Sequence, residues 1–293
     1  DTTYNTAVGY KAGYLVSTSV KNTLIGGEAG DGITSGDGLN VAVGYGALGA
    51  ASNTTQENVA IGNDALSTED GHGRNVAVGF EALKTLNAGA LGYNTAVGQQ
   101  AGKAVTTGVQ NTIIGALAGD ALTDADYNTA VGYDALSTDT LGSRSTAIGI
   151  NTLKSQNFTT ATETYNVAVG HSAGIAVTSG IQNTLIGGLA GDALTGNGFD
   201  GSGNRVAGTD ANTAVGYAAL SGDTKGNGNV AVGKNALLAQ NFTTTEDSFN
   251  TAVGFSAGSG LAVVGAHIPG RFNTLIGGLA GDNITTGDSN III

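Results

Sequence analysis

Short apolar triplets recur along the whole chain, each opened by Asn and closed by Gly. Eight of the fifteen spacings between successive triplets are 17 residues, and the others run from 18 to 29. A repeat period of about 20 residues is typical of solenoids, in which each repeat forms one coil. The sequence therefore predicts an all-β parallel β-solenoid of about sixteen 17-residue coils that spans residues 1–293 as a single domain. The repeats, written Asn-[Thr/Val]-[Ala/Leu/Ile]-[Val/Ile]-Gly, begin at Asn5, Asn22, Asn40, Asn58, Asn75, Asn94, Asn111, Asn128, Ser145, Asn166, Asn183, Asn212, Asn229, Asn250 and Asn273, with a truncated copy at Asn290.

The second and fourth positions of each repeat are β-branched. Residues two apart in a strand share one face, so these side chains are expected to form an inward stack, with Thr6, Thr23 and Thr95 buried inside the coil. The fifth position is Gly in every complete repeat, which indicates a backbone corner that needs positive φ or a close approach. The Asn that opens all but one of the repeats is interpreted as a ladder of side-chain amides that bond along the stack.

The third position is also apolar, so both faces of the strand are predicted to be covered. In a solenoid one coil thick the second cover has to come from another chain, which predicts an oligomer. Where the third position is large, as at Leu24 and Leu185, the sixth position is small, as at Gly27 and Gly188. Closely packed seams require such an exchange of bulk, so we expect the third and sixth positions to meet at a shared interface.

Insertions into the basic repeat fall near residues 154–165, 195–211, 238–249 and 259–272. Loops carry function on repeat scaffolds, and aromatic side chains in them can stack on sugar rings or pack between coils. The ligand-binding candidates in these loops are Phe158, Phe199, Phe242, Glu163 and Glu246. Tyrosines directly before the repeat Asn allow the same two interpretations, with packing between coils favoured for Tyr93, Tyr127 and Tyr165.

Composition and charge exclude several classes of partner. The chain has 50 Gly, no Cys, Met or Trp, and a formal net charge of −12. This charge disfavours nucleic acid and anionic lipid as partners. No apolar run approaches the roughly 18 to 20 residues that a membrane-spanning helix needs, so no membrane insertion is expected.

Side chains that could support catalysis or metal binding are sparse. Gly-Asp pairs recur at one coil type, and Asp31, Asp120, Asp192 and Asp282 are interpreted as turn residues, with Ca²⁺ binding as the alternative. The three histidines lie in different coils without a second ligand at metal-binding spacing. Glu163, Glu246 and Asp247 could form a glycosidase-type carboxylate pair, but acidic loop residues are usually only solvated. We expect no enzyme activity and no cofactor.

The string Asn-[Thr/Val]-Ala-[Val/Ile]-Gly, with Ala three residues after the Gly, resembles the head repeats of trimeric autotransporter adhesins (the YadA-like family) and similar repeats in phage tail fibres. The resemblance covers nearly the whole chain and implies a left-handed parallel β-roll that packs as a homotrimer. Heptads typical of a stalk are absent, and the adhesin repeat is shorter than this one. The resemblance implies corner glycines at Gly9, Gly44, Gly79, Gly132 and Gly216, and inward aliphatic residues at Val8, Val43, Val78, Val131 and Val215.

These features predict a segment of a longer structural or adhesive fibre, a phage tail fibre or a surface adhesin. We expect it to be extracellular, on a cell surface or on a virion, and to present a surface for a host glycan or an envelope receptor. One alternative is a self-assembling filament or sheath without a ligand. Another is an ice- or mineral-binding solenoid, which would require an exposed row of Thr.

Overall fold

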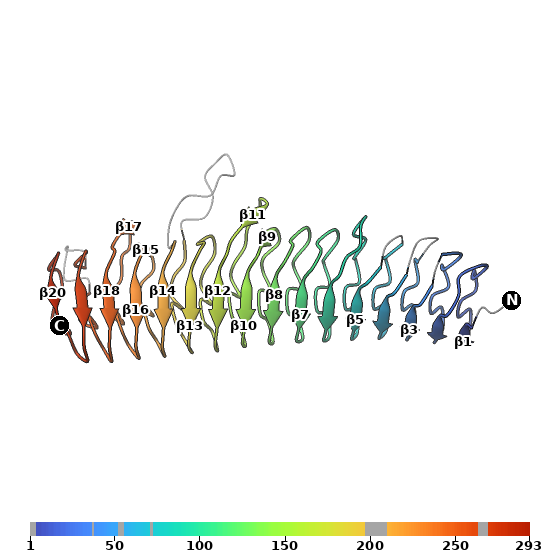
Figure 1. Ribbon diagram of the computed structural model, residues 1–293, viewed down its shortest axis with the longest axis horizontal. Coiled ribbons are helices and arrows are strands. Elements are labelled where there is room, and N and C mark those ends of the chain that lie inside the picture. Colours follow the sequence, from blue (N-terminus) through green and yellow to red (C-terminus); the bar gives the residue numbers. More distant parts are fainter. Residues whose placement is uncertain (1–3, 37, 52–55, 71–72, 197–209, 263–268) are drawn as a thin grey trace. The chain divides into compact units, whose positions relative to one another are not determined.

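The computed structural model describes residues 4–36, 38–51, 56–70, 73–196, 210–262 and 269–293. In this part the chain is an all-β parallel solenoid, and each coil contributes one short strand to a parallel ladder (Figure 1). The predicted fold class is therefore confirmed. Contacts divide the chain into two compact units, Asp1–Leu141 and Gly142–Ile293, so the prediction of a single domain stays a prediction.

The first unit stacks eight strands in chain order. Neighbouring strands are parallel and in register, so that Thr6 pairs with Thr23, and Ala7 with Leu24. Like positions of successive repeats thus lie side by side, which produces rows of equivalent side chains along the stack. The strands are β1 (Thr6–Val8), β2 (Thr23–Ile25), β3 (Val41–Val43), β4 (Val59–Ile61), β5 (Val76–Val78), β6 (Thr95–Val97), β7 (Thr112–Ile114) and β8 (Thr129–Val131).

The second unit repeats this arrangement and adds two small sheets. In the small sheets, β9 (Gly142–Ser143) pairs with β11 (Thr162–Glu163), and β15 (Gly226–Asn227) pairs with β17 (Glu246–Asp247). In each small sheet one strand lies in an insertion, β11 in 154–165 and β17 in 238–249. The main ladder of this unit consists of β10 (Thr146–Ile148), β12 (Val167–Val169), β13 (Thr184–Ile186), β14 (Thr213–Val215), β16 (Val230–Val232), β18 (Thr251–Val253), β19 (Thr274–Ile276) and β20 (Ile291–Ile292).

The strand faces are the reverse of those predicted. The third position points into the coil and is fully buried, as at Ala42 and Ala60, whereas the second and fourth positions point outward and are partly exposed. The interior of a single coil is narrow, so the strand contributes its small side chain there and directs its β-branched side chains outward. The expected burial of Thr6, Thr23 and Thr95 is wrong for the same reason. The inward stack is therefore also wrong for Val8, Val43, Val78, Val131 and Val215.

The exchange of bulk takes place inside the coil rather than at an interface. Large third-position side chains such as Leu24 project toward glycines on the opposite wall, where an added Cβ at Gly30 would lie 2.7 Å from a Leu24 methyl carbon. At Gly102, an added Cβ would lie 2.9 Å from Ile113 and 3.0 Å from Leu83 of the neighbouring coils. Several coils with Ala at the third position instead fill the interior with a buried Leu, such as Leu48 or Leu66, and interiors tolerate neither voids nor overlap. The expected contact between third and sixth positions is wrong, because the sixth position lies outside.

The predicted corner glycines have the expected backbone conformation. Their φ angles are 132° at Gly9, 136° at Gly44, 138° at Gly79, 136° at Gly132 and 135° at Gly216, in a region essentially restricted to Gly. At Gly216 an added Cβ would lie only 2.6 Å from the carbonyl carbon of Gly233 in the next coil. Both positive φ and close approach of successive coils therefore require Gly at this position.

Buried asparagines form a continuous amide ladder within each unit. The Asn111 backbone N–H donates to Asn94 Oδ1 at 2.9 Å, and Asn111 Nδ2 donates to the Ala125 carbonyl at 2.8 Å. Asn128 in turn donates its backbone N–H to Asn111 Oδ1 at 2.9 Å. These amides thus satisfy a backbone donor of the next coil, and several also bond a carbonyl across their own coil, which confirms the ladder interpretation.

Candidate functional site

The outward face of the strands is an extended uncharged surface of the coils. Across all the described strands of the main ladder, the second and fourth positions are Thr, Val or Ile without a single charge. The fourth-position side chains remain accessible, with 38% of Ile61 and 39% of Ile114 exposed. Extended apolar patches of this kind are uncommon on soluble monomers and mark interaction surfaces.

Aromatic rings border this face on the side of the corner glycines. Sixth-position rings are about half exposed, and Tyr45 lies over Gly27 of the preceding coil, where an added Cβ would be 3.2 Å from the ring. Tyr217 lies over Gly188 in the same way, at 3.5 Å. The small sixth-position residues thus accommodate a tyrosine ring of the next coil.

The loop phenylalanines are not surface groups. Phe158 and Phe242 are completely buried and are the largest side chains of the core. The backbone N–H of Phe242 donates to the buried Asp223 carboxylate at 3.1 Å, and burial raises the pKa of that carboxyl. The prediction that these two residues bind a ligand is therefore wrong, because the wider coils at the insertions need large side chains to fill them. Phe199 lies outside the described residues.

The predicted Glu163 lies on the surface in β11 and joins a cluster with a cation and an aromatic ring. Arg144 Nε donates to Glu163 at 3.0 Å, and the Tyr165 hydroxyl donates to its other oxygen at 2.6 Å. The guanidinium of Arg144 lies 5.9 Å from the centre of the Tyr165 ring. The hydrogen bond from Tyr165 and the adjacent Arg144 lower the pKa of Glu163, so this carboxylate stays ionised.

The predicted Glu246 takes part in a similar cluster around β17. Arg271 Nη1 donates to Glu246 at 3.1 Å, and its guanidinium lies 5.8 Å from the centre of the Phe272 ring. A second ring, Phe249, lies 5.9 Å from that of Phe272 with 30° between their planes. Asn227 donates weakly to Asp247 in the same small sheet, at 3.4 Å.

A third cluster, in the first unit, was missed by sequence reasoning. Arg74 donates to Glu57 at 2.7 Å and to the Tyr93 hydroxyl at 2.6 Å, and its guanidinium lies 5.6 Å from the centre of the Tyr93 ring. These hydrogen bonds raise the pKa of Arg74. Glu57, Arg74 and Tyr93 directly precede the Asn of three successive repeats, so the signal was present in the pre-Asn position.

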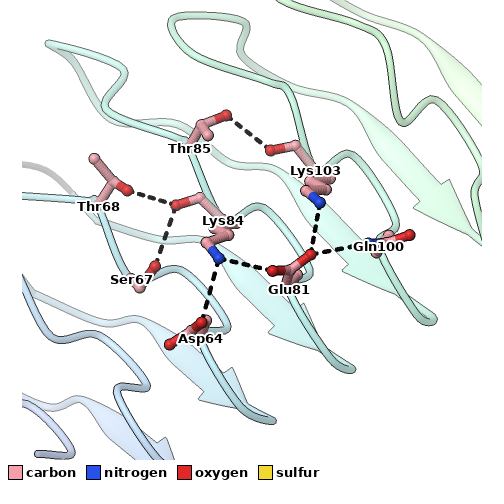
Figure 2. A network of polar contacts seen from close by, with 8 residues as sticks. All are labelled: Asp64, Ser67, Thr68, Glu81, Lys84, Thr85, Gln100 and Lys103. Carbon is pink, nitrogen blue, oxygen red and sulfur yellow. Dashed lines mark hydrogen bonds and ion pairs between the residues drawn. The ribbon is translucent and has the colours of Figure 1, made fainter.

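Another polar network links three coils of the first unit, as Figure 2 shows. Glu81 accepts from Lys84 and Lys103, each at 2.7 Å, and from Gln100 at 2.9 Å. Lys84 also pairs with Asp64 of the preceding coil at 3.2 Å. The donors Lys103, Lys84 and Gln100 lower the pKa of Glu81 to about 2. The network ties neighbouring coils together and exposes no unpaired nucleophile or base.

The Gly-Asp carboxylates occupy coil corners and are partly buried. Asp31, Asp120, Asp192 and Asp282 occupy equivalent positions in four different coils. Burial raises the pKa of Asp31 and of Asp192. Within the described residues, no group of three His, Cys, Asp or Glu side chains is arranged to hold a metal ion. The same part of the chain contains no helix of the length and apolarity that crossing a bilayer requires.

Comparison with known proteins adds no relative to this description. No protein-family model, no curated protein and no solved structure matches the chain.

Proposed function

We propose that this chain is a structural and adhesive segment of an extracellular fibre, located on a cell surface or a virion. Its protomers pack side by side, as a homotrimer, through the outward strand face. The resemblance to YadA-like head repeats and to tail-fibre repeats supports this proposal, and so does the solenoid fold. The resemblance also implies a left-handed coil.

The observation that carries the proposal is the uncharged outward face. Charged residues make up 12% of the chain, yet they are absent from the two outward strand positions and gather at its borders, for example at Lys11 and Glu81. An apolar centre with a polar rim is the usual anatomy of a protein interface. A partner must also match the spacing of the coils, about 4.8 Å, to stay in register along many rows. A second copy of this chain meets that condition.

The mass of the chain in solution tests the assembly. We expect a discrete trimer by sedimentation or light scattering, and we expect the double variant Ile61→Lys/Ile114→Lys to be monomeric yet folded, because both side chains point outward. Thr107→Lys adds a charge at an exposed turn away from the strands and serves as the control that retains the trimer. A monomeric unmodified chain would refute lateral assembly, and polymers joined end to end would favour the filament alternative.

The ice- or mineral-binding alternative has to be tested separately, because Thr side chains of the second position point outward after all. The Thr row is interrupted by Val41, Val59 and Val76 and is bordered by half-exposed aromatic rings, so it is neither uniform nor flat. Fibre packing therefore explains the face better. Thermal hysteresis in a solution of the chain would favour ice binding instead.

A further inference from the structure

Three clusters on the described surface share one composition. Each joins an aromatic ring that directly precedes a repeat Asn, an arginine beside that ring and a carboxylate bound to the arginine. The carboxylate comes from a neighbouring coil or from a small second sheet. The three clusters, called ring triads below, are Tyr93 with Arg74 and Glu57, Tyr165 with Arg144 and Glu163, and Phe272 with Arg271 and Glu246.

The rings of the ring triads share one backbone conformation. Tyr93, Tyr165 and Phe272 all have left-handed φ angles, of 51°, 51° and 59°. Each is about half exposed, at 46%, 49% and 50%, so part of every residue is open to solvent. An exposed aromatic ring is a suitable stacking surface, because it has few side-chain torsions to lose on binding.

The polar groups beside each ring favour a polyhydroxylated ligand. An ionised carboxylate accepts hydrogen bonds and a guanidinium donates them, so each ring triad offers both functions to a vicinal pair of hydroxyl groups. In the second unit, the Phe249 ring lies beside Phe272, so this site contains a second aromatic ring. The Phe249 ring itself lies against Gly228, where an added Cβ would be 2.5 Å from it. Sugars combine an apolar ring face with such hydroxyl pairs.

Charge distinguishes a neutral sugar from an acidic one. In each ring triad the arginine is paired with a carboxylate, which offsets its charge, and the backbone N–H of Arg271 also donates to Asp288 at 2.7 Å. The chain as a whole carries a formal charge of −12, which repels polyanionic glycans. We propose that the ring triads are binding sites for neutral oligosaccharides, used repeatedly along one chain. This inference rests on the proposed adhesive role and gives it a ligand class.

Repetition compensates for weak individual sites. A single ring with two hydrogen-bonding groups provides modest affinity, but several such sites on one chain, multiplied by assembly, raise the effective concentration of a bound polymer. The relevant ligand is therefore a chain of neutral sugar units rather than a single monosaccharide.

The experiment is saturation-transfer NMR and calorimetry of the full chain with four neutral probes: cellohexaose, maltohexaose, chitohexaose and a mannohexaose. At least one is expected to bind, with the strongest transfer to the carbon-bound protons of the sugar ring. The triple variant Tyr93→Ala/Tyr165→Ala/Phe272→Ala should weaken binding by about tenfold or more, which corresponds to about 1.4 kcal/mol, because it removes the aromatic stacking surface of each site. Tyr165→Phe keeps the ring and should retain most of the affinity of its site.

The matched control is Tyr133→Ala. Tyr133 is equally exposed, at 50%, but lies at the sixth position, away from the ring triads, so its removal should leave sugar affinity unchanged. If the triple variant loses its circular-dichroism spectrum, the three single variants carry the test instead. The proposal is overturned by no binding of any probe, by equal affinity of the variants, or by preferential binding of a heparin-derived hexasaccharide or a proline-rich peptide.

Sedimentation of the same samples separates this inference from the proposed assembly. Discrete trimers that bind none of the probes would overturn the sugar sites alone. Sugar binding by a monomer would support the ring triads and refute lateral packing.

Discussion

Substitution of a corner glycine provides the sharpest test of how the coils are held together. In Gly216→Ala the new methyl group would lie 2.6 Å from the carbonyl carbon and oxygen of Gly233 and 3.0 Å from the backbone nitrogen of Lys234. All three are backbone atoms of the next coil, so no side-chain rotation relieves the overlap. The two coils have to separate locally.

The expected cost follows from two contributions. Alanine at a φ of 135° occupies a backbone region that is essentially restricted to Gly, which costs about 1–3 kcal/mol. Overpacking of a filled site adds about 1–3 kcal/mol. The sum of about 2–6 kcal/mol is a large part of the 5–15 kcal/mol that typically stabilises a domain. Separation also weakens the bonds that join these two coils, from Gly233 N to the Val215 carbonyl, at 2.8 Å, and from Asn235 N to the Tyr217 carbonyl, at 3.0 Å.

Denaturant unfolding and amide hydrogen exchange measure this effect. Because each coil contacts only its neighbours, exchange should accelerate most at the amides of Gly233 and Asn235 and least in distant coils. The control is Gly278→Ala, since Gly278 follows the corner glycine of another coil, does not have a positive φ and has no atom within 4 Å of an added Cβ. That variant should change stability by no more than about 0.5 kcal/mol. Equal stability of the two variants would refute the close-approach argument.

Three further predictions follow from the network, the ladder and the core. Because the pKa of Glu81 is depressed from 4.5 to about 2, ionised Glu81 stabilises the fold above pH 4.5, and this contribution is lost as the pH falls from 4.5 to about 2. Glu81→Gln should therefore remove the contribution of Glu81 to the loss of stability on acidification. A carboxyl NMR titration and melting curves across that window check this, and an ordinary Glu81 pKa would contradict the pairing with Lys84 and Lys103. Asn111→Ala should lower the free energy of unfolding, measured with denaturant, by about 2–5 kcal/mol, because it leaves buried backbone groups of two coils without partners. A decrease below about 1 kcal/mol would mean that water replaces the amide. Phe242→Ala should lower the free energy of unfolding by about 3–5 kcal/mol and leave the sugar affinity of each site in the folded protein unchanged. Loss of sugar binding without loss of stability would instead support the predicted role of Phe242 as a ligand contact.

The repeat itself allowed the coil, its corner and its amide ladder to be predicted. An invariant Gly after a β-branched residue predicted the corner that Gly44 and Gly79 adopt, and an invariant Asn can be satisfied repeatedly only by its own copies. The orientation of the strand could not be predicted in this way. Both faces are apolar, and the rule that bulky residues point inward fails where the interior is as narrow as a single coil.

The left-handed backbone conformation of residues other than glycine was also beyond sequence reasoning. Leu48, Leu66 and Leu83 have φ angles of 47° to 52°, although a bulky side chain ordinarily avoids the left-handed region. Their burial and their ladder hydrogen bonds offset this cost, and neither is apparent from the residue type. The ring triads were missed in part for a related reason, since Arg74 and Tyr93 are brought together by coil stacking and are 19 residues apart.

The amide ladder makes coil length independent of coil spacing. Asn212 follows Asn183 by 29 residues, yet its backbone N–H reaches Asn183 Oδ1 at 3.0 Å, close to the 2.9 Å found across the 17 residues between Asn212 and Asn229. The 23 residues from Asn250 to Asn273 give the same 2.9 Å. New segments can therefore be grafted between the asparagines without shifting the coils on either side. The scaffold is suited to diversification by loop exchange, in evolution or in protein engineering.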